Sequence, residues 1–232
     1  MSSRYIVNPY IFAGIKAGLK SWWELGEASG TRSDSHGSND LTENGTVSQI
    51  TGVSGNASES TSSSNYLSKS SPVGIAFGDV DFSIACWMRS NGNPANNEYG
   101  FELGDGSGGS DRSYWLQVSA SGPKRWNFRV SNDGSSTSSV QFGSNISSNT
   151  WHFIYAFHDA ANNLIGINQD DGTEVTSSHT TGVNASAADF EIHGTSSPIG
   201  GADSFGIWGR LLSAAEQTWL YNSGSGRAYS DL

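Results

Sequence analysis

Asp81-Phe-Ser-Ile-Ala-Cys-Trp-Met88 is the stretch that decides the fold, because apolar residues recur along it at every second position. Successive side chains of a β-strand point to opposite faces, so this alternation is typical of a strand with one buried face. The face expected to meet the core carries Phe82, Ile84, Cys86 and Met88. The stretch therefore predicts a β-strand in which Cys86 is a small core residue.

The same period-two pattern recurs along most of the chain. Further stretches that carry it are 19–25, 113–118, 125–130, 151–157, 163–168 and 204–208. In the first of them Leu19, Trp23 and Leu25 are expected to face the core, and Trp22 the opposite side. Gly, Asn, Asp and Ser fill the intervals between the stretches, as in turns between antiparallel strands. The pattern predicts an all-β protein.

One short helix is expected near the end of the chain. Ser213-Ala-Ala-Glu216 has the spacing of a capping box, in which the serine and glutamate side chains each bond the other's backbone N–H. The helix would run through Trp219 and Leu220 and end at Gly224. Strands and helix together indicate a two-sheet sandwich or jelly roll with a single C-terminal helix.

The composition indicates one domain that binds neither nucleic acid nor a membrane. The 232 residues carry a formal net charge of −10 without a cluster of Lys or Arg, which disfavours a polyanionic partner. No apolar run approaches the ~20 residues of a membrane-spanning helix, so we expect no membrane insertion. We expect residues 1–17 to form an N-terminal arm and residues 18–232 to form one sandwich.

Three segments, in order along the chain, resemble a known family. The first is Trp23-Glu-Leu-Gly-Glu27-Ala-Ser-Gly30, continued by Asp34-Ser-His-Gly37-Ser-Asn39-Asp40-Leu41. The second is Asp81–Trp87, answered by Thr150-Trp151-His152, and the third runs from Ala202 to Glu216. Together they resemble the laminin-G-like branch of the concanavalin A-like lectin/glucanase superfamily. The resemblance implies an antiparallel two-sheet jelly-roll sandwich.

The sequence does not favour an enzyme. Glucanases of the superfamily carry Glu-x-Asp-x-x-Glu on one strand, because retaining hydrolysis needs two carboxylates about 5–5.5 Å apart. No such run occurs in the chain, and its histidines lack the spacing of zinc ligands. We therefore expect no catalytic residues.

The resemblance implies a structural calcium ion where the first and last strands meet. Carboxylate, amide and carbonyl oxygens are the ligands that calcium prefers. The positions that match are Asp34, Asn39, Asp40 and Asp203. The alternative is that Asp34 and Asn39 only stabilise a turn through hydrogen bonds to the backbone.

A glycan or partner site is the second feature that the resemblance implies. Lectin sites of this fold stack an aromatic ring on the sugar and surround the sugar with amides and charged groups. The candidates, which point away from the inferred core and could line one outer sheet face, are Trp87, Trp115, Asn127 and Arg129. Alternatively, a loop or the N-terminal arm covers the tryptophans.

The N-terminal arm is the basis of a hypothesis about where the protein is located and what it is attached to. Its apolar residues are Tyr5, Ile6, Val7, Pro9, Tyr10, Ile11 and Phe12. They are expected to pack on their own domain or on a neighbouring subunit, and Arg4–Tyr10 resembles the start of bacteriophage structural proteins that carry this domain. This resemblance implies a lectin-like protein on the virion surface, docked by its arm to a capsid or tail and in contact with host-surface glycans. The alternatives are a free extracellular lectin, dependent on calcium or on its aromatic residues, and a diverged hydrolase.

Overall fold

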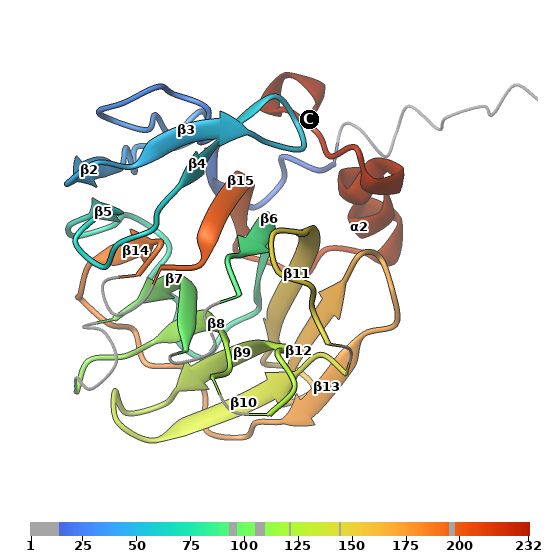
Figure 1. The fold of residues 1–232 in the computed structure, drawn as a ribbon. Helices are drawn as coiled ribbons and strands as arrows, with labels where there is room; N and C mark the ends of the chain where they lie inside the picture. The colour runs from blue at the N-terminus through green and yellow to red at the C-terminus, as the bar shows by residue number, and fades with distance from the viewer. Residues whose placement is uncertain (1–13, 93–96, 105–109, 121, 144, 195–197) are drawn as a thin grey trace, which may run out of the picture.

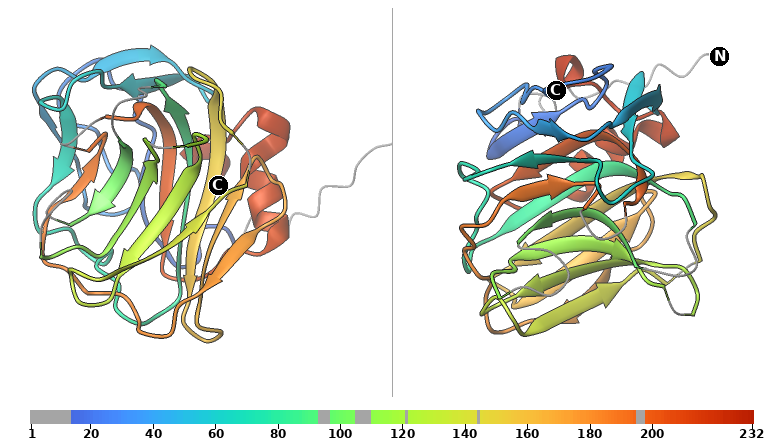
Figure 2. Two further views of the ribbon diagram at one scale, coloured as in Figure 1. Left: turned by 60° about the horizontal axis from the view of Figure 1, so that its bottom comes forward. Right: turned by 60° about the vertical axis from the view of Figure 1, so that its left-hand side comes forward.

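The computed structural model describes residues 14–92, 97–104, 110–120, 122–143, 145–194 and 198–232, and these form a sandwich of two antiparallel sheets (Figures 1 and 2). The first, here called the β6 sheet, has the order β13-β12-β11-β6-β15-β4-β3, with β1 paired to β15. The second, the β8 sheet, has the order β10-β9-β8-β7-β14-β5-β2. The predicted fold class is confirmed.

The strands and the helix have the following bounds. The β6 sheet contains β1 (Leu19–Trp23), β3 (Ser48–Thr51), β4 (Asn56–Glu59), β6 (Phe82–Ser90), β11 (Trp151–Asp159), β12 (Leu164–Gln169), β13 (Val175–Ser178) and β15 (Gly200–Trp208). The β8 sheet contains β2 (Thr42–Asn44), β5 (Tyr66–Lys69), β7 (Glu98–Leu103), β8 (Tyr114–Val118), β9 (Trp126–Ser131), β10 (Thr137–Gln141) and β14 (Phe190–Ile192). The helix is α2 (Ala214–Tyr221), and two short 3-10 turns, Asn222–Gly224 and Tyr229–Asp231, follow it.

The main core lies between the two sheets. The alternating residues of β6 enter it as the sequence predicts, and Phe82, Ile84, Cys86 and Met88 are fully buried there. Leu116 on β8 and Phe128 on β9 enter the same core from the β8 sheet. Burial raises the pKa of the Cys86 thiol well above its usual value, so this thiol stays protonated and Cys86 is a core residue as predicted.

A second apolar cluster covers the outer face of the β6 sheet. Trp22 and Trp208 meet edge to face, with ring centroids 6.2 Å apart, and Trp219 and Leu220 of α2 belong to the same cluster. The helix begins at the predicted capping box of Ser213 and Glu216. It ends at Tyr221, three residues earlier than predicted, because Asn222 takes up the left-handed conformation that closes it. The outer face of the β6 sheet is therefore covered by the C-terminal helix (Figure 2).

The described chain begins as part of the packed body. Ile15 is fully buried, and its carbonyl oxygen accepts a hydrogen bond of 2.7 Å from Trp208 Nε1. Arg210 donates to the carbonyl oxygens of Gly14 (3.0 Å) and Ala17 (2.6 Å). Residues 14–17, which the sequence places in the arm, thus pack on the sandwich. The arm residues Tyr5 to Phe12 lie outside the described residues. Within the described part of the chain, no helix has the length and apolarity needed to cross a membrane.

Candidate functional site

The outer face of the β8 sheet gathers aromatic, amide and charged side chains. The strand register places Trp115 opposite Glu102 of β7 and Arg129 of β9. Two residues further along β8, Gln117 lies opposite Tyr99 and Asn127. Residues directly opposite each other in neighbouring strands share a face, so all six side chains belong to one surface.

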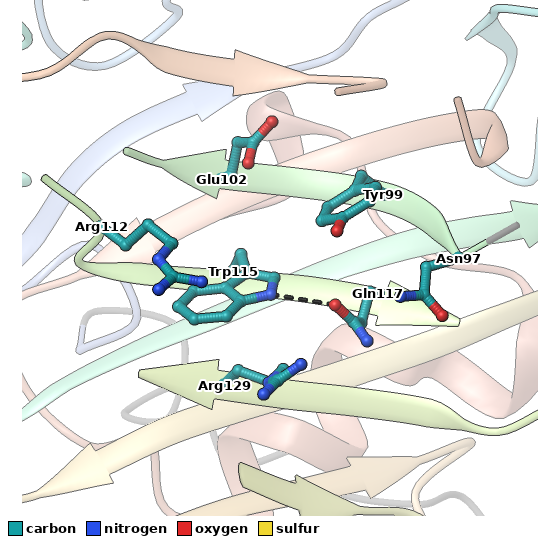
Figure 3. A pocket seen from close by; sticks show the side chains of 7 residues that line it. All are labelled: Asn97, Tyr99, Glu102, Arg112, Trp115, Gln117 and Arg129. Carbon is teal, nitrogen blue, oxygen red and sulfur yellow. Dashed lines mark hydrogen bonds between the residues drawn. The ribbon is translucent and has the colours of Figure 1, made fainter. Parts of the chain in front are cut away.

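All of these side chains except that of Asn127 line a cavity of about 190 Å³ (Figure 3). We call it the Trp115 pocket, and its lining residues are Asn97, Tyr99, Glu102, Arg112, Trp115, Gln117 and Arg129. Liquid water occupies about 30 Å³ per molecule, so the pocket holds the volume of roughly six waters. This volume suits a single small ring or a short branch of a ligand.

Trp115 forms the floor of the pocket, held between two arginines. The guanidinium carbon of Arg112 lies 5.5 Å from the centroid of the indole, and that of Arg129 lies 5.2 Å from it. Both distances are within the ~6 Å over which a cation is attracted to an aromatic face. Trp115 Nε1 donates a hydrogen bond of 3.1 Å to Gln117 Oε1 (Figure 3). The Gln117 amide is thereby oriented, and no described residue accepts a hydrogen bond from its NH₂ group.

The polar groups of this surface are incompletely satisfied. Arg129 Nη2 donates to Thr137 Oγ1 at 2.8 Å, but the buried Arg129 Nε has no hydrogen-bond partner among the described residues. Asn127 is buried, and within the described chain its Oδ1 has no partner either. Burial lowers the pKa of Arg129, and the charge of Arg112 lowers it further. A buried polar atom without a partner costs about 1–3 kcal/mol, so these groups favour a polar ligand.

Of the four predicted glycan-binding residues, the structure brings together Trp115, Asn127 and Arg129, but not Trp87. Trp87 lies on the outer face of the β6 sheet, where its ring stacks on Tyr221 (centroids 5.8 Å, interplanar angle 20°) and packs on Phe153. The prediction that Trp87 shares a face with Trp115 is wrong. Alternation shows that a side chain points away from the core, but not to which sheet its strand belongs.

A second hollow, of about 480 Å³, borders Trp87. Trp151, Asp170 and Tyr221 contribute to its walls. The carboxylate of Asp170 is already bound, because it accepts a hydrogen bond from the Phe153 backbone (2.9 Å) and pairs with His152 Nδ1 (2.7 Å). The Asp170 carboxylate is therefore not free to bind a ligand in this hollow.

Asp34, one of the four predicted calcium ligands, organises a turn. Its Oδ1 accepts backbone hydrogen bonds from Trp22 (3.0 Å), His36 (3.0 Å) and Gly37 (2.8 Å), and its Oδ2 accepts one from Asn39 (2.9 Å). Burial alone would raise the pKa of Asp34, but these four bonds outweigh it, and the pKa is lowered.

Asn39 and Asp40 form hydrogen bonds in the same loop as Asp34. Asn39 Oδ1 accepts from the Val73 backbone at 2.7 Å, and its Nδ2 donates to Ser21 Oγ at 2.8 Å. Asp40 Oδ1 accepts from the backbone N–H of Asp34 at 2.8 Å. All three side chains stabilise the loop, and for Asp34 and Asn39 this is the alternative that the sequence left open.

Asp203 is fully buried and holds a different turn. Its Oδ2 accepts backbone hydrogen bonds from Val53 (2.6 Å) and Ser54 (3.0 Å), and its Oδ1 accepts one from Ser204 Oγ (3.1 Å). Burial raises its pKa in spite of these bonds. Across the described residues no three His, Cys, Asp or Glu side chains gather into a metal site. The four residues do not fit a calcium site, because Asp34, Asp40 and Asp203 do not gather into one group and most of the side-chain oxygens already accept hydrogen bonds from N–H or O–H donors.

Most residues that line the Trp115 pocket were not among the site residues predicted from the sequence. Gln117 follows Trp115 at the strand period, so the alternation could have pointed to it. Tyr99 and Glu102 lie on either side of a register shift in β7, which breaks the alternation. Arg112 precedes β8 and reaches Trp115 from outside the strand.

Comparison with known proteins identifies the family and the fold. The family model described as the concanavalin A-like lectin/glucanases superfamily matches residues 60–216. The binding domain of Paraclostridial Mosquitocidal Protein 1 superposes with a TM-score of 0.72 at 16% identity, covering 90% of this chain and 53% of that one. A structure of botulinum neurotoxin type C, whose cell entry is described as dependent upon interaction with two ganglioside molecules, has a TM-score of 0.69 at 16% identity, covering 91% and 52%.

A smaller structure matches along nearly its whole length. Domain 4 of AbnA, an extracellular arabinanase from Geobacillus stearothermophilus in complex with arabinotriose, has a TM-score of 0.63 at 14% identity, and the match covers 90% of this chain and 98% of that domain. The chain spans about half the length of the two toxin chains. At these identities the likeness establishes the fold alone. No curated protein matches the sequence.

Proposed function

The chain belongs to the concanavalin A-like lectin/glucanase superfamily, and from this membership we propose that it is a non-enzymatic carbohydrate-binding protein whose Trp115 pocket receives one sugar unit of a cell-surface glycan. The observation that carries the proposal is the pocket itself, in which an indole floor is ringed by amide, hydroxyl, carboxylate and guanidinium groups. Sugars present the complementary chemistry, since their hydroxyl groups both donate and accept hydrogen bonds and their C–H faces pack on aromatic rings.

The burial of the floor decides which groups supply the affinity. Trp115 is only 4% exposed, so it offers a sugar little area for stacking. Binding then depends on hydrogen bonds donated by Gln117, Asn97 and Arg129 and accepted by Glu102. Each contributes about 0.5–1.5 kcal/mol when both groups are neutral and about 1.5–3 kcal/mol when one is charged. This arrangement favours a ligand recognised by its polar groups.

The relatives support the class of ligand. A domain of this fold and nearly this size has been solved with arabinotriose bound, and the neurotoxin type C structure is described in terms of gangliosides. The pocket supports binding without hydrolysis, because Glu102 is the one carboxylate among the described residues that line it. Both retaining and inverting hydrolysis use a pair of carboxylates.

The experiment that tests the proposal is a glycan array followed by isothermal titration calorimetry. Gln117→Ala removes a donor from the pocket and is expected to weaken binding about 3- to 10-fold, the effect of one neutral hydrogen bond. Gln141→Ala is the matched control, because Gln141 is an exposed residue on the edge strand of the same sheet. Failure of the wild type to bind any glycan, or equal binding by Gln117→Ala, would contradict the proposal.

Attachment to a larger assembly stays a prediction. The virion surface is the setting proposed for this lectin-like domain, with residues 5–12 docking it to a capsid or tail. Because residues 14–17 pack on the sandwich, the truncation that isolates the arm ends at residue 13. A chain without residues 1–13 is expected to fold and to bind glycan, but not to incorporate into particles. Normal incorporation of this truncation would exclude the docking role.

A further inference from the structure

The Trp115 pocket has the opposite charge balance to the chain as a whole. The chain carries a net charge of −10, whereas the described residues that line the pocket contribute the guanidinium groups of Arg112 and Arg129 and one carboxylate, that of Glu102. Figure 3 shows the two arginines on different sides of the Trp115 ring. The pocket is therefore a local positive site on an acidic protein.

The two arginines of the pocket have no carboxylate partner among the residues that the structure describes. Elsewhere in the chain Arg32 pairs with Glu27 and Glu43, Arg89 pairs with Glu59, and Arg210 pairs with Glu216. In the described part of the chain, no carboxylate oxygen lies within 4.0 Å of a guanidinium nitrogen of Arg112 or Arg129, so neither forms an ion pair. Their hydrogen bonds go to neutral oxygens instead.

The register explains why Glu102 does not neutralise Arg129. The two residues lie opposite Trp115 on its two neighbouring strands. Adjacent strands are about 4.8 Å apart, so the backbone positions of Glu102 and Arg129 are separated by roughly 10 Å with the indole between them. The two charges thus occupy opposite sides of the pocket.

The partners that Arg112 and Arg129 do have leave donors available. Arg112 donates through Nε to the Gly134 carbonyl (3.3 Å) and through Nη2 to the Ser135 carbonyl (2.5 Å). Arg129 uses Nη2 on Thr137, which leaves its buried Nε without a partner among the described residues. Among the described residues no carboxylate forms an ion pair with either of these two like charges, which lie against one indole.

We propose that the ligand of this pocket is an acidic sugar, of the uronic or sialic type, whose carboxylate binds the guanidinium of Arg129 beside Arg112. The inference rests on the proposed function and names the class of its ligand. The planar carboxylate accepts paired hydrogen bonds from a guanidinium fork, which is the geometry that arginine recognises best. Glu102 and Gln117, on other sides of the pocket, bond the hydroxyl groups of the sugar ring.

The charge balance favours one carboxylate over a more highly charged group. Among the described lining residues, two guanidiniums and the Glu102 carboxylate leave a single positive charge, which one ligand carboxylate balances. A multiply charged sulfated or phosphorylated sugar would bring excess charge toward Glu102. The acidity of the rest of the chain acts mainly beyond the ~8 Å screening length of physiological salt, so it slows encounter more than it weakens the bound complex.

The test compares matched sugars by titration calorimetry against the full chain. The probes are trigalacturonic acid and its methyl ester for the uronic source, sialyllactose and lactose for the sialic source, and arabinotriose as a further neutral sugar. We expect at least tenfold tighter binding of an acidic probe than of its neutral counterpart. The natural ligand is assigned to the uronic or to the sialic class according to which acidic probe, trigalacturonic acid or sialyllactose, binds.

Variants locate the effect in the pocket. Arg129→Gln is expected to weaken binding of the acidic probe about 10- to 100-fold, and Arg129→Lys to restore it in part, because lysine keeps the charge but not the fork. Arg227→Gln is the matched control, since Arg227 lies 4.7 Å from the Trp219 ring on the opposite side of the sandwich and should have no effect. Circular dichroism and melting temperature verify that each variant is folded.

Each outcome separates the inference from the proposed function. Equal binding of an acid and its ester or neutral counterpart would overturn the acidic-ligand inference while leaving carbohydrate binding in place. Tighter binding of sulfated lactose, titrated beside sialyllactose as a further probe, than of either carboxylated sugar would also overturn it. Absence of binding to every sugar would overturn both. Because the comparison of acid with ester uses the wild type alone, it holds even if Arg129→Gln does not fold.

Discussion

Replacing Trp87 by alanine is expected to damage stability and leave sugar binding intact. Trp87 is 4% exposed and packs between β6 and the C-terminal segment, where its ring contacts Tyr221 and Phe153. Truncating a buried tryptophan to alanine typically costs about 3–5 kcal/mol, because packing is lost and a cavity remains. Trp87 borders an open hollow into which its surroundings can collapse, so we expect the lower end of this range, about 3 kcal/mol.

The assay is thermal unfolding followed by titration with the preferred glycan. For a chain of this length 1 kcal/mol shifts the melting temperature by about 2–4 °C, so the Trp87→Ala melting temperature should fall by roughly 6–12 °C. Below that temperature the dissociation constant should match the wild type, because the Trp115 pocket lies on the other sheet. An unchanged melting temperature combined with lost glycan binding would refute this assignment of the two tryptophans.

The remaining predictions concern the two turns and the arm. For Asp34, whose pKa is lower in the folded chain than the unfolded value of about 3.9, the stabilisation is present above that unfolded value and is lost as the pH falls through the folded pKa. Urea unfolding should therefore give a difference in the free energy of unfolding between wild type and Asp34→Asn that is constant from pH 7 to 5 and shrinks below about pH 4. A difference that grows in acid would contradict this role of Asp34. Asp203→Ala should cost about 2–4 kcal/mol in the same assay, since the Val53 and Ser54 N–H groups lose their acceptor. Asp203→Asn, which keeps one acceptor oxygen, should cost less, and equal losses would contradict the turn-holding role. A chelator should leave the wild-type melting temperature unchanged, and a fall of several degrees would restore the calcium prediction. Deleting residues 1–13 should change neither the melting temperature nor the glycan affinity, and a loss of either would make those residues part of the domain.

Alternation along single strands predicted the main core well. The residues of β6 fill the space between the sheets because a period of two is a property of the strand itself, independent of its partners. The same rule failed at Leu19, which belongs to the outer cluster and not to the main core. A register shift between Leu19 and Ser21 in the pairing of β1 with β15 turns Leu19 to the other face, and such bulges depend on the partner strand.

The site was harder to predict than the fold because its parts are distant in sequence. Trp115, Asn127 and Arg129 were found because they sit at outward positions of two neighbouring strands. The separation of Trp87 from them follows from the order of strands in each sheet, which alternation does not encode. The hydrogen bond from Val53 to Asp203 likewise joins residues 150 apart, so the role of that carboxylate could be recognised only in the folded chain.

The most direct measurement of the central claim follows the indole N–H signals of the tryptophans by NMR during titration with trigalacturonic acid, sialyllactose and arabinotriose. The Trp115 N–H, which bonds Gln117 in the free protein, lies on the floor of the pocket. Carbohydrate binding at this site predicts a saturable shift of the Trp115 signal with at least one of these sugars, while the Trp219 and Trp151 signals stay in place. A shift confined to Trp151 or Trp87, or no shift with any of the three sugars, would contradict the account.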